Sequence, residues 1–239
     1  AWRAGIAERW GYRTDFRSWL LTRSVPPPVR VHQIDYYLQL VNALGFPGGG
    51  EAPRIDVTDQ LRAVGASMLK TAGWDVAAPL VAMAPGAAFG AAKRWPSASF
   101  ASVADRLATE GVRTVILGSA GDRPAALELA AAMRAPARPL DLVGRTDLPR
   151  LAGVLANCRT LLTNDSGAMH FATALGTNVV VMFGPTRERE TSPRGAGRQA
   201  LLTHPVWCRP CMLRECPLTH RCMRGISVDT VHAAVQSFL

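Results

Sequence analysis

Short apolar runs alternate with longer stretches of helical periodicity from about residue 79 onward. The short runs span 80–83, 112–117, 140–143, 160–163 and 178–183, and the longer stretches span 100–110, 125–134, 148–156 and 168–175. Short continuous apolar runs are typical of buried parallel strands, and the longer stretches are typical of helices. Because strand and helix alternate, right-handed crossovers are expected to build a parallel sheet with helices on both faces. The pattern therefore predicts an α/β fold of the Rossmann-like kind.

The first part of the chain has a different pattern. Residues 1–70 contain a break at Pro26–Pro28 and a flexible, glycine-rich stretch at Gly48–Gly50, which together indicate the tail of another domain followed by a linker. The Rossmann-like domain is expected over 71–226. Residues 227–239 are expected to form a C-terminal helix that Ser227 caps, as serine is a preferred first residue of helices.

A turn between a predicted strand and a predicted helix, Thr163–His170, carries the strongest candidate chemistry. A helix that begins at Ser166 or Gly167 would direct unpaired backbone N–H groups and the positive end of its dipole at the strand's carboxyl end. An anion such as a diphosphate binds well at such a place, and Gly167 would allow it close approach. The alternative is a plain helix cap, because Asn, Asp and Ser also begin helices that bind nothing. His170 is then an ordinary helix residue.

Other loops also follow predicted strands, where ligands bind in parallel sheets. They span 84–86, 118–122, 144–147 and 183–186. The glycine fingerprint G-x-G-x-x-G and the Walker A loop are both absent, which disfavours simple nicotinamide or flavin dehydrogenases and P-loop enzymes. The sequence thus favours a ligand site at the strand ends that uses neither of these motifs.

Composition narrows the class of protein. The 239 residues are 48% hydrophobic and 19% charged, which is ordinary for a globular chain and excludes extensive disorder. No apolar run approaches the roughly 20 residues that span a bilayer, and no signal peptide is recognisable, so a cytoplasmic location is expected. The net charge of +9 suggests an acidic partner, such as a nucleotide, an anionic lipid or nucleic acid. Nucleic acid is disfavoured because the basic residues are scattered and no recognised motif accompanies them.

Four cysteines near the end of the chain, Cys208, Cys211, Cys216 and Cys222, could supply the thiolates of a tetrahedral structural zinc site. Reduced thiols that pack in a lid, or redox pairs, are the alternatives, since spacing alone does not establish ligation. Cys158 stands alone in an apolar stretch and is expected to be a small buried residue.

Five motifs in order resemble the bacterial glycosyltransferases of family nine, and within it the ADP-heptose:lipopolysaccharide heptosyltransferases of the heptosyltransferase II group. The motifs are Pro85–Pro96 with its Lys93-Arg-Trp-Pro96 ending, Leu117–Asp122, Asn164–Leu175, Met182–Thr186 and the cysteine run Cys208–Cys222. The resemblance implies the glycosyltransferase B architecture of two Rossmann-like domains. The C-terminal half would hold the nucleotide sugar, and residues 1–70 would be the remnant of the N-terminal acceptor domain.

The resemblance also implies roles for particular residues. Lys93 would contact the donor phosphates and neutralise the leaving diphosphate. Asp165, Ser166, Gly167 and His170 would form the donor-binding turn, and Asp122, Gly144 and Thr146 would lie by the ribose and adenine. The alternatives from the residues alone are a solvated loop lysine, helix capping by Asp122 and a simple turn at Gly144. The catalytic base is expected in the N-terminal half and is not identified.

The expected function is therefore inverting transfer of heptose from ADP-heptose to the lipopolysaccharide inner core, without a required metal cofactor. The surplus positive charge suits a peripheral protein at the inner leaflet of the inner membrane. Two alternatives remain. One is a nucleotide-binding module without transfer activity, because the acceptor half has no match here. The other is a zinc-stabilised nucleic-acid-binding protein.

Overall fold

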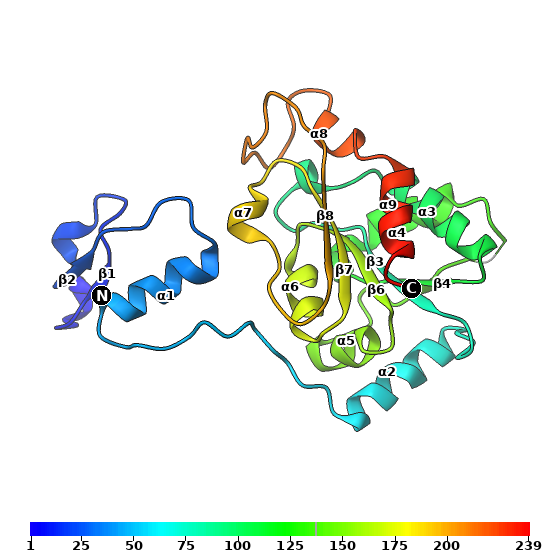
Figure 1. Cartoon of the computed structure of the whole chain (residues 1–239), viewed down its shortest axis with the longest axis horizontal. Coiled ribbons are helices and arrows are strands. Elements are labelled where there is room, and N and C mark those ends of the chain that lie inside the picture. Colours follow the sequence, from blue (N-terminus) through cyan, green and yellow to red (C-terminus); the bar gives the residue numbers. More distant parts are fainter. Residues whose placement is uncertain (137) are drawn as a thin grey trace. The chain divides into compact units, whose positions relative to one another are not determined.

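The computed structural model describes residues 1–136 and 138–239. The chain divides into two compact units (Figure 1). The larger, which we call the sheet unit, comprises Ala52–Arg187 and Pro193–Leu239, and the smaller, the N-terminal unit, comprises Ala1–Glu51 and Glu188–Ser192. Within the described ranges, no helix has both the length and the apolar character needed to cross a bilayer.

The sheet unit is built on six parallel strands in the order β5-β4-β3-β6-β7-β8. Their bounds are β3 Leu80–Ala84, β4 Arg113–Ile116, β5 Leu140–Asp141, β6 Thr160–Asn164, β7 Asn178–Phe183 and β8 Gln199–Thr203. All five predicted strands are present. The sixth, β8, was not predicted, because it is an edge strand whose residues alternate between exposed and half-buried and give no continuous apolar run. The strand order reverses between β3 and β6, where crevices form in open sheets of this kind.

Helices cover both faces of the sheet, as Figure 1 shows. Their bounds are α2 Asp59–Thr71, α3 Ser97–Thr109, α4 Arg123–Ala132, α5 Leu148–Leu155, α6 Gly167–Ala174, α8 Arg221–Arg224 and α9 Val228–Gln236. Successive residues of β3 pack into the cores on opposite faces of the sheet. Val81 and Met83 lie in the core under α3, α4 and α9. Leu80, Ala82 and Ala84 lie in the core under α2, α5 and α6. Both faces of the strand are therefore buried, which is why it reads as an uninterrupted apolar run.

Helix α2 was not predicted. It begins after Thr58, whose hydroxyl accepts a hydrogen bond from the N–H of Leu61 at 3.2 Å. It packs closely on α5 through two glycines, since a Cβ added at Gly65 would lie 2.1 Å from the carbonyl carbon of Gly153. Gly65 disfavours a helix in isolation, but it is what allows this approach. The structure thus places α2 in the sheet unit; the division at residues 70 and 226 stays a prediction.

The C-terminal helix α9 follows the predicted cap. The hydroxyl of Ser227 accepts a hydrogen bond from the N–H of Thr230 at 3.1 Å. Val231 and Val235 are fully buried on the side that meets α3 and the sheet. This helix therefore closes one face of the sheet unit.

The N-terminal unit contains a two-stranded parallel sheet and short helices. Its elements are η1 Trp2–Ala4, β1 Trp10–Tyr12, η2 Ser18–Leu20, β2 Arg23–Val25, α1 Gln33–Ala43 and α7 Glu188–Thr191. Helix α1 is capped by His32, whose Nδ1 accepts from the N–H of Ile34 at 3.2 Å while Nε2 donates to the carbonyl of Ser192 at 2.8 Å. The buried ring of His32 thus ties the two parts of this unit together.

Candidate functional site

The candidate site lies in the sheet unit, at the carboxyl ends of β3 and β6, where the strand order reverses. The loop after β3 runs from Pro85 to Pro96 and contains the short helix η3, Ala91–Lys93. The loop after β6 is the turn that leads into α6. Because parallel strands end at the same edge of the sheet, these two loops meet.

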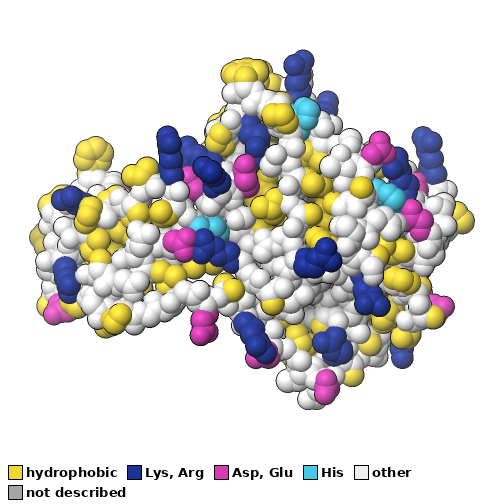
Figure 2. Space-filling view, in the orientation of Figure 1, with side chains coloured by type: hydrophobic (Ala, Val, Ile, Leu, Met, Phe, Trp, Pro, Cys, Tyr) yellow, Lys and Arg dark blue, Asp and Glu magenta, His cyan; other side chains and the backbone are white. Residues whose placement is uncertain are grey.

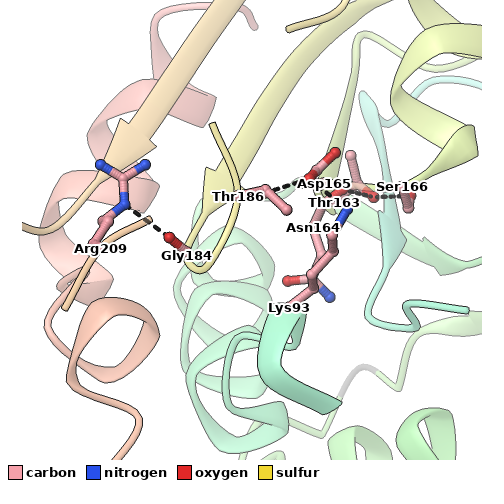
Figure 3. Close-up of polar contacts among 8 residues, drawn as sticks. All are labelled: Lys93, Thr163, Asn164, Asp165, Ser166, Gly184, Thr186 and Arg209. Atoms are coloured by element: carbon pink, nitrogen blue, oxygen red, sulfur yellow. Dashed lines mark hydrogen bonds and ion pairs between the residues drawn. The ribbon is translucent and has the colours of Figure 1, made fainter. Parts of the chain in front are cut away.

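Lys93 and Asp165 form a buried ion pair between the two loops. Their Nζ and Oδ2 atoms lie 2.6 Å apart, and the side chains are only 12% and 5% exposed. The hydroxyl of Thr186, which follows β7, donates to the same Asp165 oxygen at 2.6 Å (Figure 3). A pair so little exposed to water is held in a defined geometry, unlike the ion pairs of a solvated surface. Lys93 is thus not the solvated loop lysine of the alternative interpretation.

Asn164 joins the two loops through its buried amide. Its Oδ1 accepts from the backbone N–H of Trp95 at 2.9 Å, and its Nδ2 donates to the carbonyls of Pro85 and Gly86 at 2.8 and 3.2 Å. Every polar atom of this fully buried side chain therefore serves to position the β3 loop. Asn164 and Thr186 were not among the predicted site residues. Asn164 is the last residue of β6 and Thr186 lies three residues after β7, so a polar residue at or just beyond the end of a buried strand is the signal that would have identified them.

The N-terminus of α6 opens toward the site. The helix begins at Gly167 after Ser166, and the Ser166 side chain does not cap it. Instead the Ser166 hydroxyl lies 3.2 Å from that of Thr163, as Figure 3 shows. A Cβ at Gly167 would meet no atom within 4 Å. The start of this helix thus has no side-chain cap and leaves open space beside Gly167, as an anion site requires. His170 lies one turn further on and is exposed.

A cavity of ≈ 600 Å³ lies beside this helix start. Four predicted site residues line it: Asp122, Thr146, Ser166 and Gly167. Its apolar wall includes Leu148, Leu151, Leu155, Leu161 and Phe171. Lys93, Asp165, His170 and Gly144 are not among its lining residues. The predicted site residues therefore divide into those that line the cavity, which is large enough for a small-molecule ligand, and those that do not line it.

Asp122 has the capping role that the sequence offered as an alternative. Its Oδ2 accepts from both the N–H and the hydroxyl of Ser119, at 2.8 Å each. Its Oδ1 lies against Gly86, where an added Cβ would come within 1.9 Å of it. Gly144 forms a turn with φ of +71°, and its N–H donates to the carbonyl of Gly118 at 2.9 Å. One carboxylate thus both caps η4 (Ala120–Asp122) and borders the cavity.

The four predicted zinc ligands line a second cavity of ≈ 520 Å³, together with His204 and His220. Among the residues that the structure describes, no three His, Cys, Asp or Glu side chains are placed to hold a metal ion. Cys211 is exposed whereas Cys222 is buried. Burial raises the pKa of the Cys222 thiol, and the neighbouring Cys216 raises it further. The structure therefore gives no support to the predicted zinc site: the cysteines gather around one cavity without converging on one point.

On the face of the molecule seen in Figure 2, charged side chains are scattered. The face seen in Figure 2 carries Lys and Arg side chains in several separate places, with acidic side chains between them. A continuous stripe of basic residues, as nucleic-acid binding requires, is not visible on this face. The scattered arrangement is the one expected from the sequence.

Comparisons with known proteins agree with this site and fold. The family model for glycosyltransferase family 9 (heptosyltransferase) matches residues 1–221. Lipooligosaccharide heptosyltransferase 2 of Haemophilus influenzae is 38% identical over 117 residues, and lipopolysaccharide heptosyltransferase 2 of Salmonella typhimurium is 40% identical over 117. Each match covers 48% of this chain and 34% of the relative, so the matched segment spans about a third of the length of these curated relatives.

Solved structures extend the likeness to nearly the whole chain. The structure of Escherichia coli ADP-heptose lps heptosyltransferase II superposes with a TM-score of 0.79 at 27% identity, over 98% of this chain and 70% of that one. A family 9 glycosyl transferase from Veillonella parvula gives a TM-score of 0.74 at 23% identity, over 93% and 64%, which supports the fold alone. The predicted α/β fold of the glycosyltransferase B type and the predicted family resemblance are both confirmed.

Proposed function

The chain belongs to glycosyltransferase family 9, the heptosyltransferases, and from this premise we propose that it transfers heptose from ADP-heptose to the lipopolysaccharide inner core. The similarity to lipopolysaccharide heptosyltransferase 2 of S. typhimurium supports the acceptor, and the similarity to the E. coli ADP-heptose enzyme supports the donor. The proposed reaction inverts the configuration at the anomeric carbon and requires no metal. The proposed partners are the ADP-sugar, the core acceptor and the inner leaflet of the inner membrane; nucleic acid is not among them.

One observation carries the proposal: a buried Lys93–Asp165 pair stands beside the uncapped N-terminus of α6. In the transfer, an acceptor hydroxyl forms a bond to the anomeric carbon while the bond from that carbon to the diphosphate breaks. The electron pair of the broken bond leaves with ADP, so negative charge grows on the diphosphate. Preorganised donors stabilise such charge without having to reorient. The Nζ of Lys93 and the first N–H groups of α6 are the donors proposed for this role.

The pair also explains how Lys93 is held ready. Asp165 fixes the ammonium at 2.6 Å, and Thr186 fixes the carboxylate in turn. When a diphosphate binds, Lys93 has a second anion to contact while Asp165 keeps its position. Ser166, Gly167 and His170 are proposed to complete the diphosphate site. Asp165 is thus proposed as a positioning residue for the lysine.

The nucleoside is proposed to occupy the cavity of ≈ 600 Å³. The Oδ1 of Asp122 borders it and is proposed to accept a hydrogen bond from a ribose hydroxyl. The apolar side chains Leu148, Leu151 and Phe171 offer a wall on which an adenine can pack. Thr146, which lines the cavity, is proposed to contact the base through its backbone, and the turn at Gly144 is proposed to lie beside that contact.

Calorimetric titration with ADP, UDP and GDP tests the proposal. We expect saturable binding of ADP, weaker binding of the other two, and a loss of about tenfold or more in ADP affinity for Lys93→Ala, as for a lost charge-assisted contact. A Lys93→Ala, His170→Ala double variant should lose more. Lys70→Ala is the matched control, because Lys70 is exposed at the end of α2, away from the site.

Lys93→Ala also leaves Asp165 buried without its partner, so a fold defect must be separated from a binding defect. A Lys93→Met, Asp165→Asn double variant removes both charges together and should fold like the parent by circular dichroism while still failing to bind ADP tightly. A folded parent chain that binds none of the three nucleotides would overturn the proposal. Tight ADP binding without transfer to a lipopolysaccharide core acceptor would support a nucleotide-binding module instead.

A further inference from the structure

The cysteine-rich segment, residues 205–222, is fastened to the loops of the candidate site by its backbone and its polar side chains. The carbonyl of Arg214 accepts from the N–H of Ala92 at 2.9 Å, and Nε2 of His220 donates to the carbonyl of Ala92 at 2.7 Å. Arg209 donates through Nε to the carbonyl of Gly184 at 2.8 Å, as Figure 3 shows. The segment therefore holds both the β3 loop, just before Lys93, and the loop after β7.

This attachment brings a second cation to the β3 loop. The guanidinium carbon of Arg214 lies 5.2 Å from the centroid of the Phe89 ring, and Nζ of Lys93 lies 4.7 Å from the same centroid. Two positive charges that share one ring are no further apart than about one Debye length, ~10 Å at 0.1 M salt, so they repel each other. Both cations gain from the ring itself, which offsets part of that repulsion.

Lys93 and Arg214 differ in whether a nearby negative charge balances their positive charge. Lys93 has Asp165 at 2.6 Å, and their side chains are buried. Arg214 is exposed, and within the described residues its guanidinium makes no ion pair or hydrogen bond beyond the Phe89 contact. All five N–H donors of this guanidinium are therefore available to a ligand. An arginine that already contacts an aromatic ring loses less side-chain freedom when it binds an anion.

We propose that Arg214, Phe89 and Lys93 form one anion site, in which Arg214 binds phosphate oxygens of a substrate while Lys93 binds from the other side. The inference rests on the proposed function and gives the cysteine-rich segment a role, which is to carry Arg214 to the site. A planar guanidinium can donate parallel hydrogen bonds to two oxygens of one phosphate, whereas an ammonium lacks this fork geometry. The phosphate comes either from the diphosphate of the donor or from a phosphate group on the acceptor.

Variants at Arg214 test the site by calorimetry on the whole chain. The probes are ADP, adenosine and a phosphorylated core oligosaccharide. Arg214→Ala is expected to weaken the binding of a phosphate-bearing probe by about tenfold, the loss typical of one charge-assisted contact. Arg214→Lys should restore only part of it, because the fork geometry is lost. Arg224→Ala is the matched control, since Arg224 is an exposed arginine at the end of α8, in the adjoining part of the chain.

The probes separate the sources of the phosphate. Weaker binding of ADP with unchanged binding of adenosine assigns Arg214 to the donor diphosphate, and unchanged ADP with weaker binding of the phosphorylated oligosaccharide assigns it to the acceptor. Either result supports the site, provided that thermal unfolding of Arg214→Ala matches that of the parent. If the parent binds ADP and Arg214→Ala binds every probe equally well, the Arg214 site is wrong while the proposed function stands. If the parent binds no nucleotide, the proposed function fails first.

Discussion

The two compact units differ in how far they enclose most of their large aromatic side chains. In the sheet unit, Trp95 is 1% exposed, its indole N–H donates to the carbonyl of Ile226 at 3.0 Å, and its ring packs edge-on against Phe100. In the N-terminal unit, Trp19 is 73% exposed and Phe16 is 99% exposed. Trp2 contacts Trp19 edge-on, but both rings remain open to water. The packed layers of the sheet unit thus enclose Trp95 and Phe100, whereas these rings of the N-terminal unit lie open to water; Trp207, in the cysteine-rich segment of the sheet unit, is exposed as well.

This difference follows from the architecture of each unit. A six-stranded sheet with helices on both faces has two cores, and every large side chain between the layers is covered. A two-stranded sheet with one longer helix has too little surface to cover its own residues, and two strands are marginal in isolation. The candidate site belongs to the unit that is enclosed. Its geometry can therefore rest on fixed partners such as Asn164 and Thr186.

The largest expected effect comes from removing one tryptophan in each unit. Trp95→Ala should lower the free energy of unfolding by about 3–5 kcal/mol, because a large buried ring leaves a cavity and the Ile226 carbonyl loses its donor. Trp19→Ala should change it by about 0.5 kcal/mol or less, since an exposed ring stabilises little. Urea denaturation followed by circular dichroism measures both.

A different order of the two losses in unfolding free energy would contradict this comparison of the two units. A Trp19→Ala variant that unfolds as readily as Trp95→Ala would mean that the exposed aromatic surface of the N-terminal unit is covered in solution. Concentration dependence of the unfolding midpoint would then tell whether another copy of the chain covers it.

Within the sheet unit, the sequence predicted the strands from β3 to β7 but neither helix α2 nor strand β8, for a physical reason. The strands from β3 to β7 are buried on both faces, so their composition alone marks them. Helix α2 was not predicted because a glycine interrupts its helical pattern. Strand β8 was not predicted because it is an edge strand in which exposed and half-buried residues alternate. Their stability comes from packing against residues far along the chain, which local patterns do not report.

The site also has parts that the sequence predicted and parts that it did not. Lys93 and the turn from Asp165 to Gly167 were predicted from a motif and from the strand-turn-helix pattern, and the structure brings them together. The hydrogen bonds of Asn164 to the β3 loop join residues about 70 to 80 positions apart in the sequence, as crossovers in a parallel sheet require. No local pattern contains that pairing. The zinc interpretation of the four cysteines stays a prediction: among the described residues, no three His, Cys, Asp or Glu side chains are placed to hold a metal ion.

An intermediate effect is expected from adding one methyl group in each unit. Gly65→Ala places a Cβ 2.1 Å from the backbone of Gly153, so α2 and α5 must separate. Overpacking costs about 1–3 kcal/mol, and the better helix propensity of alanine offsets up to about 1 kcal/mol of it. Gly11→Ala in β1 makes only ordinary contacts with Leu21, at 3.6 Å, and should leave the stability unchanged or slightly raised. Urea midpoints for the two variants should therefore move in different directions; a destabilised Gly11→Ala with an unaffected Gly65→Ala would contradict the packing described for both units.

The smallest effect is chemical and lies entirely within the sheet unit, because residues 1–51 contain no cysteine. Cys211 is exposed, whereas Cys222 is buried and the pKa of its thiol is raised by burial and by the thiols around it. Burial also raises the pKa of Cys158. Only the thiolate reacts with iodoacetamide, so Cys211 should be modified first at neutral pH, and Cys222 and Cys158 should lag until the pH is well above the ordinary thiol range. Peptide mass spectrometry at several pH values measures the order.

The raised pKa values of Cys158 and Cys222 also make the stability of the folded chain depend on pH, which gives a second test. Since both thiols hold their protons more tightly in the folded chain, their contribution to stability is complete below the ordinary thiol pKa and is lost as the pH rises above it. Cys158→Ala should flatten that decline, whereas Cys211→Ala should not. Equal labelling of Cys211 and Cys222 would mean that the cysteine-rich segment opens readily and does not hold Arg214 at the site. If labelling of all four cysteines begins only after a chelator is added, the result would support the zinc site, because a bound metal protects its thiolate ligands from alkylation.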